Sequence, residues 1–498
     1  MQATLLKVFP GRLPAVLWLG ATLLAVGCKV GPDYERPEVT PPEAWRWKNA
    51  EPSDHVPKGE WWRVYDDPVL NSLQATAAAQ NQDLKAALAR VEQARSAARM
   101  SRADLLPTVN GSGSFTRYRT SGNAASPIGF PIPSFHAQQW QVPFDLSYEL
   151  DLWGKVRRGF EAARFSALAA DAARQNVLLS LQADVAVNYF GLVAARQEIK
   201  TLEESIELRQ EALQIFEQRL DAGVGSEFEV ERTRVEVALA QASLGQAHQR
   251  EAELQNALAV LCGAASSGFA VETTATLRPA PRIVPDLPST LLERRPDVAE
   301  AERQLAARNA EIGVRIGAFF PSVRLTAQGG FSSEELSDLF LWESRTWGIS
   351  PSVQVPLFAG GRLKADLDRA RAAYDEAVAN YRQRLLTAFR EVDDNLAAIR
   401  FLKDQYAARD TAVVSAGNAA DIALSRFSAG TVSFLEVVDA ASLKLQNEIA
   451  RIGVAREQLN ATVRLVKALG GGWDDPDPQT LSVNEPHPVE RHVSSANH

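Results

Sequence analysis

The sequence predicts a mixed α and β chain, built from long antiparallel helical hairpins and four β-strands long enough to cross a bilayer. Three observations support this fold class. A twelve-residue phrase occurs twice, 207 positions apart, as RLDAGVGSEFEV from Arg219 and as RFSAGTVSFLEV from Arg426. Segments in which apolar and polar residues alternate with period two are followed by proline-free stretches rich in strong helix formers. The chain therefore reads as two copies of one supersecondary unit.

The N-terminal residues 1–27 are predicted to be a lipoprotein signal peptide. Two basic residues precede an apolar run that is too short to span a bilayer as a helix. The run ends just before Cys28 in a segment that resembles a bacterial lipobox, although Ala25 stands where Leu is usual. We expect Cys28 to be lipidated, and Lys29 after it favours sorting to the outer membrane. The alternative is ordinary cleavage nearby, which would leave Cys28 as a spare thiol.

Net charge argues against a nucleic-acid-binding protein, and cysteine content argues against a structural disulfide. Residues 1–27 hold two basic residues and no acidic residue, so their removal changes the net charge from −8 to −10. An acidic balance of this size argues against a nucleic-acid partner. The chain has only two cysteines, so acylation of Cys28 would leave Cys262 without a disulfide partner. Cys262 is expected to be a small buried apolar residue.

Four segments show the alternation of a strand with one apolar and one polar face. They cover 108–118, 140–153, 321–331 and 346–358. Each is about ten residues or more, which is the length that a tilted strand needs to cross a bilayer. Tryptophans stand near strand ends, where interfacial aromatic girdles lie: Trp140, Trp153 and Trp347. Because the polar face carries Asp145 and Glu149, we expect it to line a watery lumen.

The remainder of each copy is predicted to be helical. No proline occurs between Lys155 and Gly263, or between Arg362 and Asp475. Each stretch is interrupted only at its copy of the repeated phrase, which predicts a helix of about 65 residues, a turn and a return helix of about 36. Shorter helices are expected over about 68–104 and 296–318. Helices this long require coiled-coil-like packing.

These elements divide the chain into six parts. A lipid-anchored extended segment, 28–66, follows the signal peptide, and a disordered tail is expected at the C-terminus. Residues 111–140 should contain the longer extracellular loop of the first strand pair. The parts are 1–27, 28–66, the first repeat 67–263, a linker 264–290, the second repeat 291–473 and the tail 474–498.

Each copy of the repeated phrase is predicted to form a hairpin tip, at 221–226 and at 428–433. Gly223 and Gly430 are suited to the left-handed residue that follows the end of a helix. Ser226 and Ser433 stand where the return helices begin, and each has a Glu three residues further on, which is the pattern of a capping box. Both tips should lie at the end furthest from the strands.

The strand count predicts oligomerisation. Four strands cannot close a barrel, and an open sheet edge cannot lie in lipid. About eight strands are the practical minimum for a membrane barrel. Several chains must therefore pool their strands, and the natural product is a β-barrel continued into a hollow cylinder of helices.

The residues also carry a family resemblance. The chain resembles the TolC-type outer-membrane efflux proteins, and among them the NodT-type lipoproteins that serve RND multidrug pumps. The resemblance covers Cys28 to Trp473 and rests on CKVGPDYERP, LLERRPDVAEAERQLAARNAEIG, FFPSV, VPLFAGGR, RFSAGTVSFLEVVDA and KALGGGW. It implies a homotrimer with a 12-stranded barrel in the outer membrane and a helical tunnel across the periplasm. It also implies docking onto a periplasmic adaptor (membrane fusion protein) and an inner-membrane RND transporter.

The resemblance further implies an acidic gate at the periplasmic end of the tunnel. The matching positions are Glu436 and Asp439, with Leu435 beside them. Three copies of two carboxylates near one axis would attract cations and repel one another. The alternative for Glu436 is a capping residue that complements the helix dipole. Where some relatives hold the gate shut through Tyr and Arg, this chain has Phe427 and Val432, so its closed state must use other contacts.

The adaptor is expected to dock at the tips themselves. The positions concerned are Gly223, Ser226, Gly430 and Ser433 with their flanking residues. The simpler interpretation is that these residues only make the turns, and both roles are compatible.

Other classes of function find less support. The chain has no H-E-x-x-H, G-x-S-x-G, Walker or G-x-G-x-x-G motif, so we expect no enzyme activity and no cofactor. The six histidines are scattered, so we expect no metal site. Within the family, channels for type I protein secretion or for metal-ion efflux are alternatives. A periplasmic coiled-coil scaffold lipoprotein would account for the helices but not for the four alternating strands.

Overall fold

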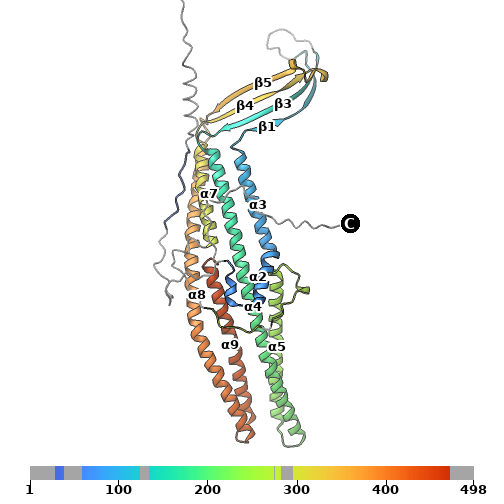
Figure 1. Ribbon diagram of the computed structural model, residues 1–498, viewed down its shortest axis with the longest axis vertical. Coiled ribbons are helices and arrows are strands. Elements are labelled where there is room, and N and C mark those ends of the chain that lie inside the picture. The colour runs from blue at the N-terminus through green and yellow to red at the C-terminus, as the bar shows by residue number, and fades with distance from the viewer. Residues whose placement is uncertain (1–28, 39–58, 124–133, 274, 282–294, 472–498) are drawn as a thin grey trace, which may run out of the picture.

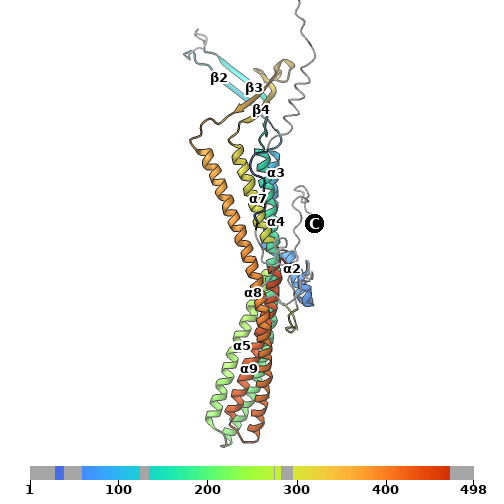
Figure 2. The same cartoon turned by 90° about the vertical axis from the view of Figure 1, so that its left-hand side faces the viewer.

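The computed structural model describes residues 29–38, 59–123, 134–273, 275–281 and 295–471. The signal peptide, Cys28, most of the extended segment, part of the linker and the tail lie outside these ranges, and so do the predictions made for them. The molecule is elongated, with a β-sheet at one end and two helical tips at the other (Figures 1 and 2). The structure thus has the predicted architecture of helical hairpins joined to a small antiparallel sheet.

Four long helices form the body of the molecule. Helices α4 and α8 each have 67 residues, which corresponds to about 100 Å at 1.5 Å per residue. Each turns at its tip into a return helix of 35 residues. The helices are α2 Pro68–Gln80, α3 Gln82–Ala103, α4 Lys155–Asp221, α5 Glu227–Leu261, α7 Pro296–Gly317, α8 Arg362–Ser428 and α9 Phe434–Ala468, and short 3-10 turns cover η1 Trp61–Tyr65, η2 Ser266–Gly268, η4 Leu336–Asp338 and η5 Trp342–Ser344.

The prediction of one helix over 68–104 was wrong, because the chain breaks at Asn81. This residue has φ −57° and ψ 131°, outside the helical region. Its side chain accepts a hydrogen bond from the backbone N–H of Leu84 and donates one to the carbonyl of Leu261. Asparagine competes for backbone partners in this way and favours caps over helix interiors. The break therefore starts α3 and ties it to the end of α5.

The sheet contains five strands at four positions. Strands β1 and β2 share the first position, β3, β4 and β5 follow in that order, and all neighbours are antiparallel. The strands are β1 Thr108–Gly111, β2 Ser114–Arg119, β3 His136–Leu150, β4 Ser322–Ser333 and β5 Arg345–Gln354. The predicted strand 108–118 is divided into β1 and β2, yet both keep one register against β3. The division falls opposite Pro143, which has no N–H to donate to the neighbouring strand.

The boundaries of the other strands also differ from prediction by one to four residues; β3 ends at Leu150 rather than 153 and β4 at Ser333 rather than 331. Two of the differences have a clear physical reason. Strand β3 begins at His136 because it continues to pair with β2 as far as Arg119, so the intervening loop is shorter than 111–140. Strand β5 ends at Gln354, before the predicted 358. Pro356 cannot donate a ladder hydrogen bond and also restricts the residue before it.

Both tips have the predicted glycine turns but not the predicted capping boxes. Gly223 and Gly430 have φ of +73° and +70°. In each tip the backbone N–H of the residue after the glycine donates to the carbonyl of the third-last helical residue, in the Schellman pattern. These hydrogen bonds run from Val224 N to Arg219 O and from Thr431 N to Arg426 O. Ser226 and Ser433 occupy the N-cap positions without a side-chain capping bond. Their carbonyl oxygens, rather than their hydroxyls, accept from the Glu three residues on.

The main core lies at mid-height, where η1, α2, α4, α5 and α9 meet. It contains fully buried Trp61, Tyr189 and Val463. Cys262 belongs to it as predicted, and burial raises the pKa of its thiol. An 18-residue window of α4 is apolar enough to cross a membrane by composition, but 61% of it is buried inside the protein. This window is therefore explained by the core rather than by contact with lipid.

The N-terminal residues 29–36 are fastened to the top of the helical body by Arg158, whose side chain is only 1% exposed. Its guanidinium donates to the carbonyls of Val30, Gly31 and Pro32 at 3.2, 3.1 and 2.9 Å. It also forms ion pairs with Asp33 and Glu161. Nearby, Arg36 and Glu302 form a bidentate pair at 2.6 and 2.7 Å. Residue 29 is thereby held beside Gly154, at the junction of β3 and α4.

Candidate functional site

The sheet has one apolar and one polar face, which the register assigns residue by residue. Residues directly opposite each other on neighbouring strands share a face. The apolar face begins at Trp140 beside Phe115 and ends at Leu150 beside Val323. Its paired positions between these ends are Val109, Gly111, Val142, Phe144, Leu146, Tyr148, Leu325, Ala327, Gly329, Phe331, Arg345, Trp347, Ile349, Pro351 and Val353.

The height of this apolar face matches a bilayer. Ten residue steps separate Trp140 from Leu150 on β3, or about 34 Å along the strand. A tilt of about 40° reduces this to about 26 Å across the membrane, close to the ~25 Å apolar band of membrane barrels. Within this band Arg345 is the only charged residue among the paired positions of the apolar face, and it lies near the end furthest from the helices.

The opposite face is polar and carries charges of both signs. Its charged residues are Asp145, Glu149 and Arg324, among Ser, Thr, Asn, Gln and Gly. Glu149 lies opposite Arg324 in the register and accepts a hydrogen bond from Lys155 at 3.1 Å. This face is suited to water, as expected from the sequence.

Both edges of the sheet are open in one chain. Strand β5 is exposed along its whole length, and so are β1 and β2. On β5, Trp347 is 83% exposed and Val353 is 64% exposed. A flat apolar edge of this kind cannot remain unpaired in lipid, because its backbone groups would lack hydrogen-bond partners.

At the other end of the molecule, the structure places the predicted gate residues in the first turns of α9. Leu435, Glu436 and Asp439 are all exposed in the single chain. Asp439 accepts a hydrogen bond from Arg232 of α5 at 3.1 Å, with side chains 65% and 35% exposed. These two residues occupy equivalent positions of the two repeats, 207 apart. The ion pair thus joins the two hairpins of one chain, a contact that sequence reasoning did not predict.

Two further contacts join the hairpins just behind the tips. Phe216 of α4 packs against Phe434 and Phe427, with ring centroids 4.1 and 6.3 Å apart. Arg209 of α4 donates to Ser442 Oγ of α9 at 3.0 Å and to the carbonyl of Glu236 of α5 at 3.2 Å. Phe427, at which we expected no Tyr- or Arg-based lock, takes part in an apolar contact.

An apolar groove of about 430 Å³ opens beside this phenylalanine cluster, between α4 and α8 and over α9. Its apolar residues include Leu208, Ile215, Leu424 and Val437, and acidic Glu204, Glu211, Asp421 and Glu448 outnumber basic Arg209 and Lys444 in its lining. Burial lowers the pKa of Arg209, which lies at its inner side. The groove lies near the tip residues that sequence reasoning assigned to docking.

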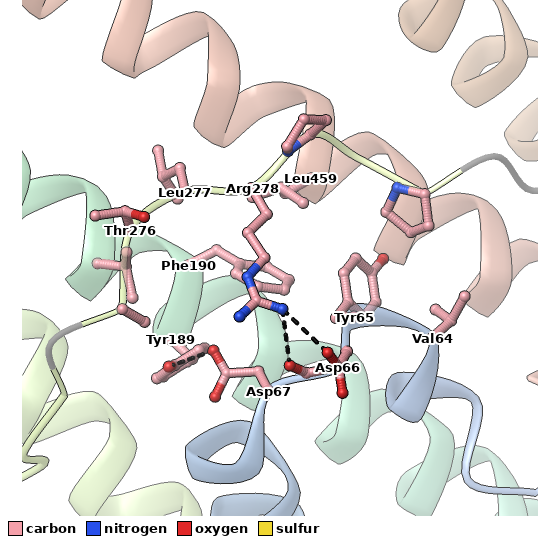
Figure 3. Close-up of a pocket in the computed structure, with 14 residues that line it drawn as sticks. Val64, Tyr65, Asp66, Asp67, Tyr189, Phe190, Thr276, Leu277, Arg278 and Leu459 are labelled. Atoms are coloured by element: carbon pink, nitrogen blue, oxygen red, sulfur yellow. Dashed lines mark hydrogen bonds and ion pairs between the residues drawn. The ribbon is translucent and has the colours of Figure 1, made fainter.

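A second pocket, of about 280 Å³, lies at mid-height beside the core (Figure 3). Arg278 extends into it from the segment 275–281 and donates to the carbonyl and Oδ2 of Asp66 at 3.1 and 3.2 Å. Asp66 has φ +49°, the only positive φ of a non-glycine residue in the described ranges. Tyr189 donates to Asp67 at 2.7 Å, and burial raises the pKa values of Tyr189 and Tyr65. No sequence pattern indicated this pocket.

Neither pocket has the composition of a metal centre. In the part of the chain that the structure describes, no group of three or more His, Cys, Asp and Glu side chains could hold a metal ion. The arrangement instead offers an apolar band for lipid, a polar face for water and an elongated helical body.

These features define a membrane-channel protein with a long helical extension. The chain belongs to the outer membrane efflux protein family, whose model matches residues 73–264 and 287–471. It is 33% identical over 473 residues to the toluene efflux pump outer membrane protein TtgC of Pseudomonas putida, covering 93% of this chain and 96% of that protein. It is 33% identical over 470 residues to the outer membrane protein OprJ of Pseudomonas aeruginosa, covering 93% and 97%.

Solved structures agree with this assignment. The outer-membrane channel OprN superimposes with a TM-score of 0.83 at 30% identity, covering 90% of this chain and 100% of that one. The CmeC outer membrane channel of Campylobacter jejuni gives a TM-score of 0.81 at 26% identity, covering 92% and 97%. The predicted family and fold class are thereby confirmed. The chain is an outer-membrane component of an efflux pump, and it resides in the outer membrane.

Proposed function

We propose that the chain forms a homotrimeric exit duct that conducts small organic molecules passively out of the cell. The observation that carries this proposal is the sheet with an apolar face of bilayer height and two open edges. Three copies would supply twelve strands, enough to close a barrel whose polar face lines the lumen. The helical body would then extend into the periplasm. Names such as toluene efflux pump component, borne by relatives, support small organic molecules as cargo.

The periplasmic end of the duct is proposed to be gated at the tips. Glu436 and Asp439 would meet their symmetry mates near the axis, with Leu435 beside them. Because Arg232 lies 3.1 Å from Asp439, each chain would place one positively charged side chain beside its two gate carboxylates, Glu436 and Asp439. The ring would therefore be less negative than six free carboxylates. Arg232–Asp439 and the phenylalanine cluster are the contacts that we assign to the closed arrangement of one chain.

Conductance in planar bilayers tests both the duct and its gate. We expect the wild type to give a small, cation-selective current. Glu436→Ala/Asp439→Ala should raise the single-channel conductance roughly twofold or more and weaken cation selectivity, because the carboxylate ring is lost. The matched control is Glu229→Ala at the equivalent position of the other tip, and it should leave both quantities unchanged.

The outcomes separate the two claims. A large wild-type current that none of these substitutions alters would leave a channel and remove the gate. Absence of both a channel and a heat-modifiable oligomer would contradict the duct itself.

A periplasmic adaptor is proposed to dock at the tips. Gly223, Ser226, Gly430 and Ser433 lie at the end of the molecule that would face the inner membrane. The groove behind them is lined by both apolar and charged residues, which suits the binding of an amphipathic helix. The adaptor would couple the duct to an inner-membrane RND transporter, completing a tripartite pump.

Lipidation of Cys28 is proposed to anchor the mature chain. The support is the position of Lys29, which lies against Gly154 where the sheet meets the helices and hence at the level of the inner leaflet. Cys28→Ser should abolish incorporation of radiolabelled palmitate, because the acyl chain has no other thiol near the cleavage site. Cys262→Ser should leave incorporation unchanged. Labelling that persists in Cys28→Ser would contradict the anchor.

A further inference from the structure

Charged residues on the apolar face occur at one end of the sheet only. The register places Arg117 and Arg119 on the same face as Phe115, opposite Gln138 and His136. The paired positions of this face contain one more arginine, Arg345, and no Asp, Glu or Lys. The three arginines, called here the outer arginines, lie at the end of the strands furthest from the helices.

The heights of Arg117 and Arg119 correspond to lipid headgroups, and Arg345 lies close beneath them. Arg117 and Arg119 are two and four residues beyond Phe115, which marks the edge of the apolar band with Trp140. At about 3.4 Å per residue and a tilt of about 40°, they stand about 5 and 10 Å above this edge. Arg345 lies just inside the edge, one row below Trp140.

The outer arginines are not neutralised by the described part of the chain. Among the described residues none of the three forms an ion pair, although Glu334, Glu335, Asp338 and Glu343 lie in the loop between β4 and β5. Arg345 packs over the ring of Trp342 and donates Nε to its carbonyl, while Arg119 donates to Ser134 Oγ at 3.4 Å. Such guanidinium groups bind phosphate bidentately.

The arginines occupy opposite edges of one sheet but meet in the proposed barrel. Arg117 and Arg119 are on β2, and Arg345 is on β5. Within one chain β3 and β4 separate these edge strands. In a closed trimer the β5 edge of one chain would pair with the β1 and β2 edge of the next, which brings the edge strands to about 4.8 Å. Each such junction would therefore combine all three arginines with exposed Trp342, Trp347 and Phe115.

We propose that these junctions bind the phosphate groups of lipid A, the phosphorylated glycolipid of the outer leaflet, with its acyl chains along the apolar face. The site rests on the proposed trimeric barrel, because one chain supplies only part of it. Arg117 and Arg119 at headgroup height, with Arg345 just inside the apolar edge, have no ion pair among the described residues and supply charge complementarity to phosphates. Phe115, below Arg117, and Trp347, below Arg345, supply the apolar surface for acyl chains. The polar face has no such arrangement, since Arg324 lies there with Glu149 opposite.

Binding of lipid A to the purified full-length mature protein tests the site, with bound lipid counted by native mass spectrometry. The variant Arg117→Gln/Arg119→Gln/Arg345→Gln should bind bisphosphorylated lipid A about tenfold or more weakly, because charge-assisted hydrogen bonds are lost. Arg324→Gln on the polar face is the control and should bind as the wild type does. Dephosphorylated lipid A and phosphatidylglycerol should bind the wild type about as weakly as lipid A binds the triple variant.

The result that overturns the site is equal binding by wild type and triple variant, or equal binding of phosphorylated and dephosphorylated lipid A. Phosphatidylglycerol that binds as tightly as lipid A would replace the glycolipid with a general anionic headgroup and also overturn the proposal. Heat-modifiable migration and conductance of the same preparations distinguish the two levels. If the protein conducts but its lipid A binding does not depend on the arginines, only the lipid site is contradicted. If the protein forms neither an oligomer nor a channel, the proposed duct is contradicted as well.

Discussion

Arg158→Ala is expected to lower the free energy of unfolding of the helical body by about 3 kcal/mol, because a buried hydrogen-bonded guanidinium is removed. The carbonyls of Val30 and Gly31 would lose the side-chain donor that Arg158 supplies, while Pro32 would keep its hydrogen bond from Asn309. The ion pairs to Asp33 and Glu161 would be lost too. Asp33 is exposed and readily hydrated, so most of the cost comes from the lost carbonyl hydrogen bonds and from the cavity left by the buried Arg158 side chain.

The measurement is the loss of helical circular dichroism on heating, together with protease sensitivity of residues 29–36. The N-terminal segment should become cleavable before the body melts, since Arg158 is its principal fastening. Arg308→Ala is the control, because this arginine forms only a half-exposed pair with Glu311 within α7. Such a pair contributes at most about 0.5 kcal/mol. Equal melting of both variants would show that Arg158 does not fasten the segment.

Gly330→Val is expected to prevent the sheet from forming its native register and so to abolish the heat-resistant oligomer. A Cβ at this position would meet the carbonyl oxygen of Val142 and lie 2.7 Å from the Cα of Pro143. Both obstacles are backbone, which cannot rotate away, so the cost is about 3 kcal/mol or more. Pro143 makes the approach necessary, since it stands directly opposite Gly330 in the middle of the sheet.

The adjacent glycine supplies a matched control. Gly329→Val makes the same chemical change one residue away, where a Cβ has nothing within 4 Å and faces the apolar side. Outer-membrane fractions of the two variants should be compared by migration before and after boiling. Gly329→Val should retain the heat-modifiable band and Gly330→Val should lose it. Retention of the band by both variants would mean that β3 and β4 can move apart at Pro143 without preventing assembly of the oligomer.

The features that follow from periodicity were predictable from the sequence. Alternation at Val142, Phe144 and Leu146 gave the strand and its apolar face, because period two directly encodes which side a residue occupies. Gly223 and Gly430 gave the hairpin tips, because few other residues adopt the left-handed conformation there. These signals are local, so they do not depend on what packs against the segment.

Features that depend on distant partners were not predictable. Arg158 looked like any helical arginine, since all its partners except Glu161 lie more than 120 positions away. Asn81 interrupts a strong helical pattern because Leu261 accepts its side-chain amide. The pairing of Arg232 with Asp439 had a signal, because the repeat alignment sets these residues at equivalent positions. Alignment does not reveal contact, however, and the relative placement of the hairpins was needed to find it.

The Arg232–Asp439 pair bears on how a duplicated chain keeps its two halves distinct. Two identical halves would carry the same residue at this position, and like charges would then face each other where the halves meet. Opposite charges allow one half to adjoin the other but discourage an assembly in which a half adjoins its own kind. In the proposed trimer this difference would favour a ring with threefold rather than sixfold order, in which the whole chain, rather than one repeat, is the building block.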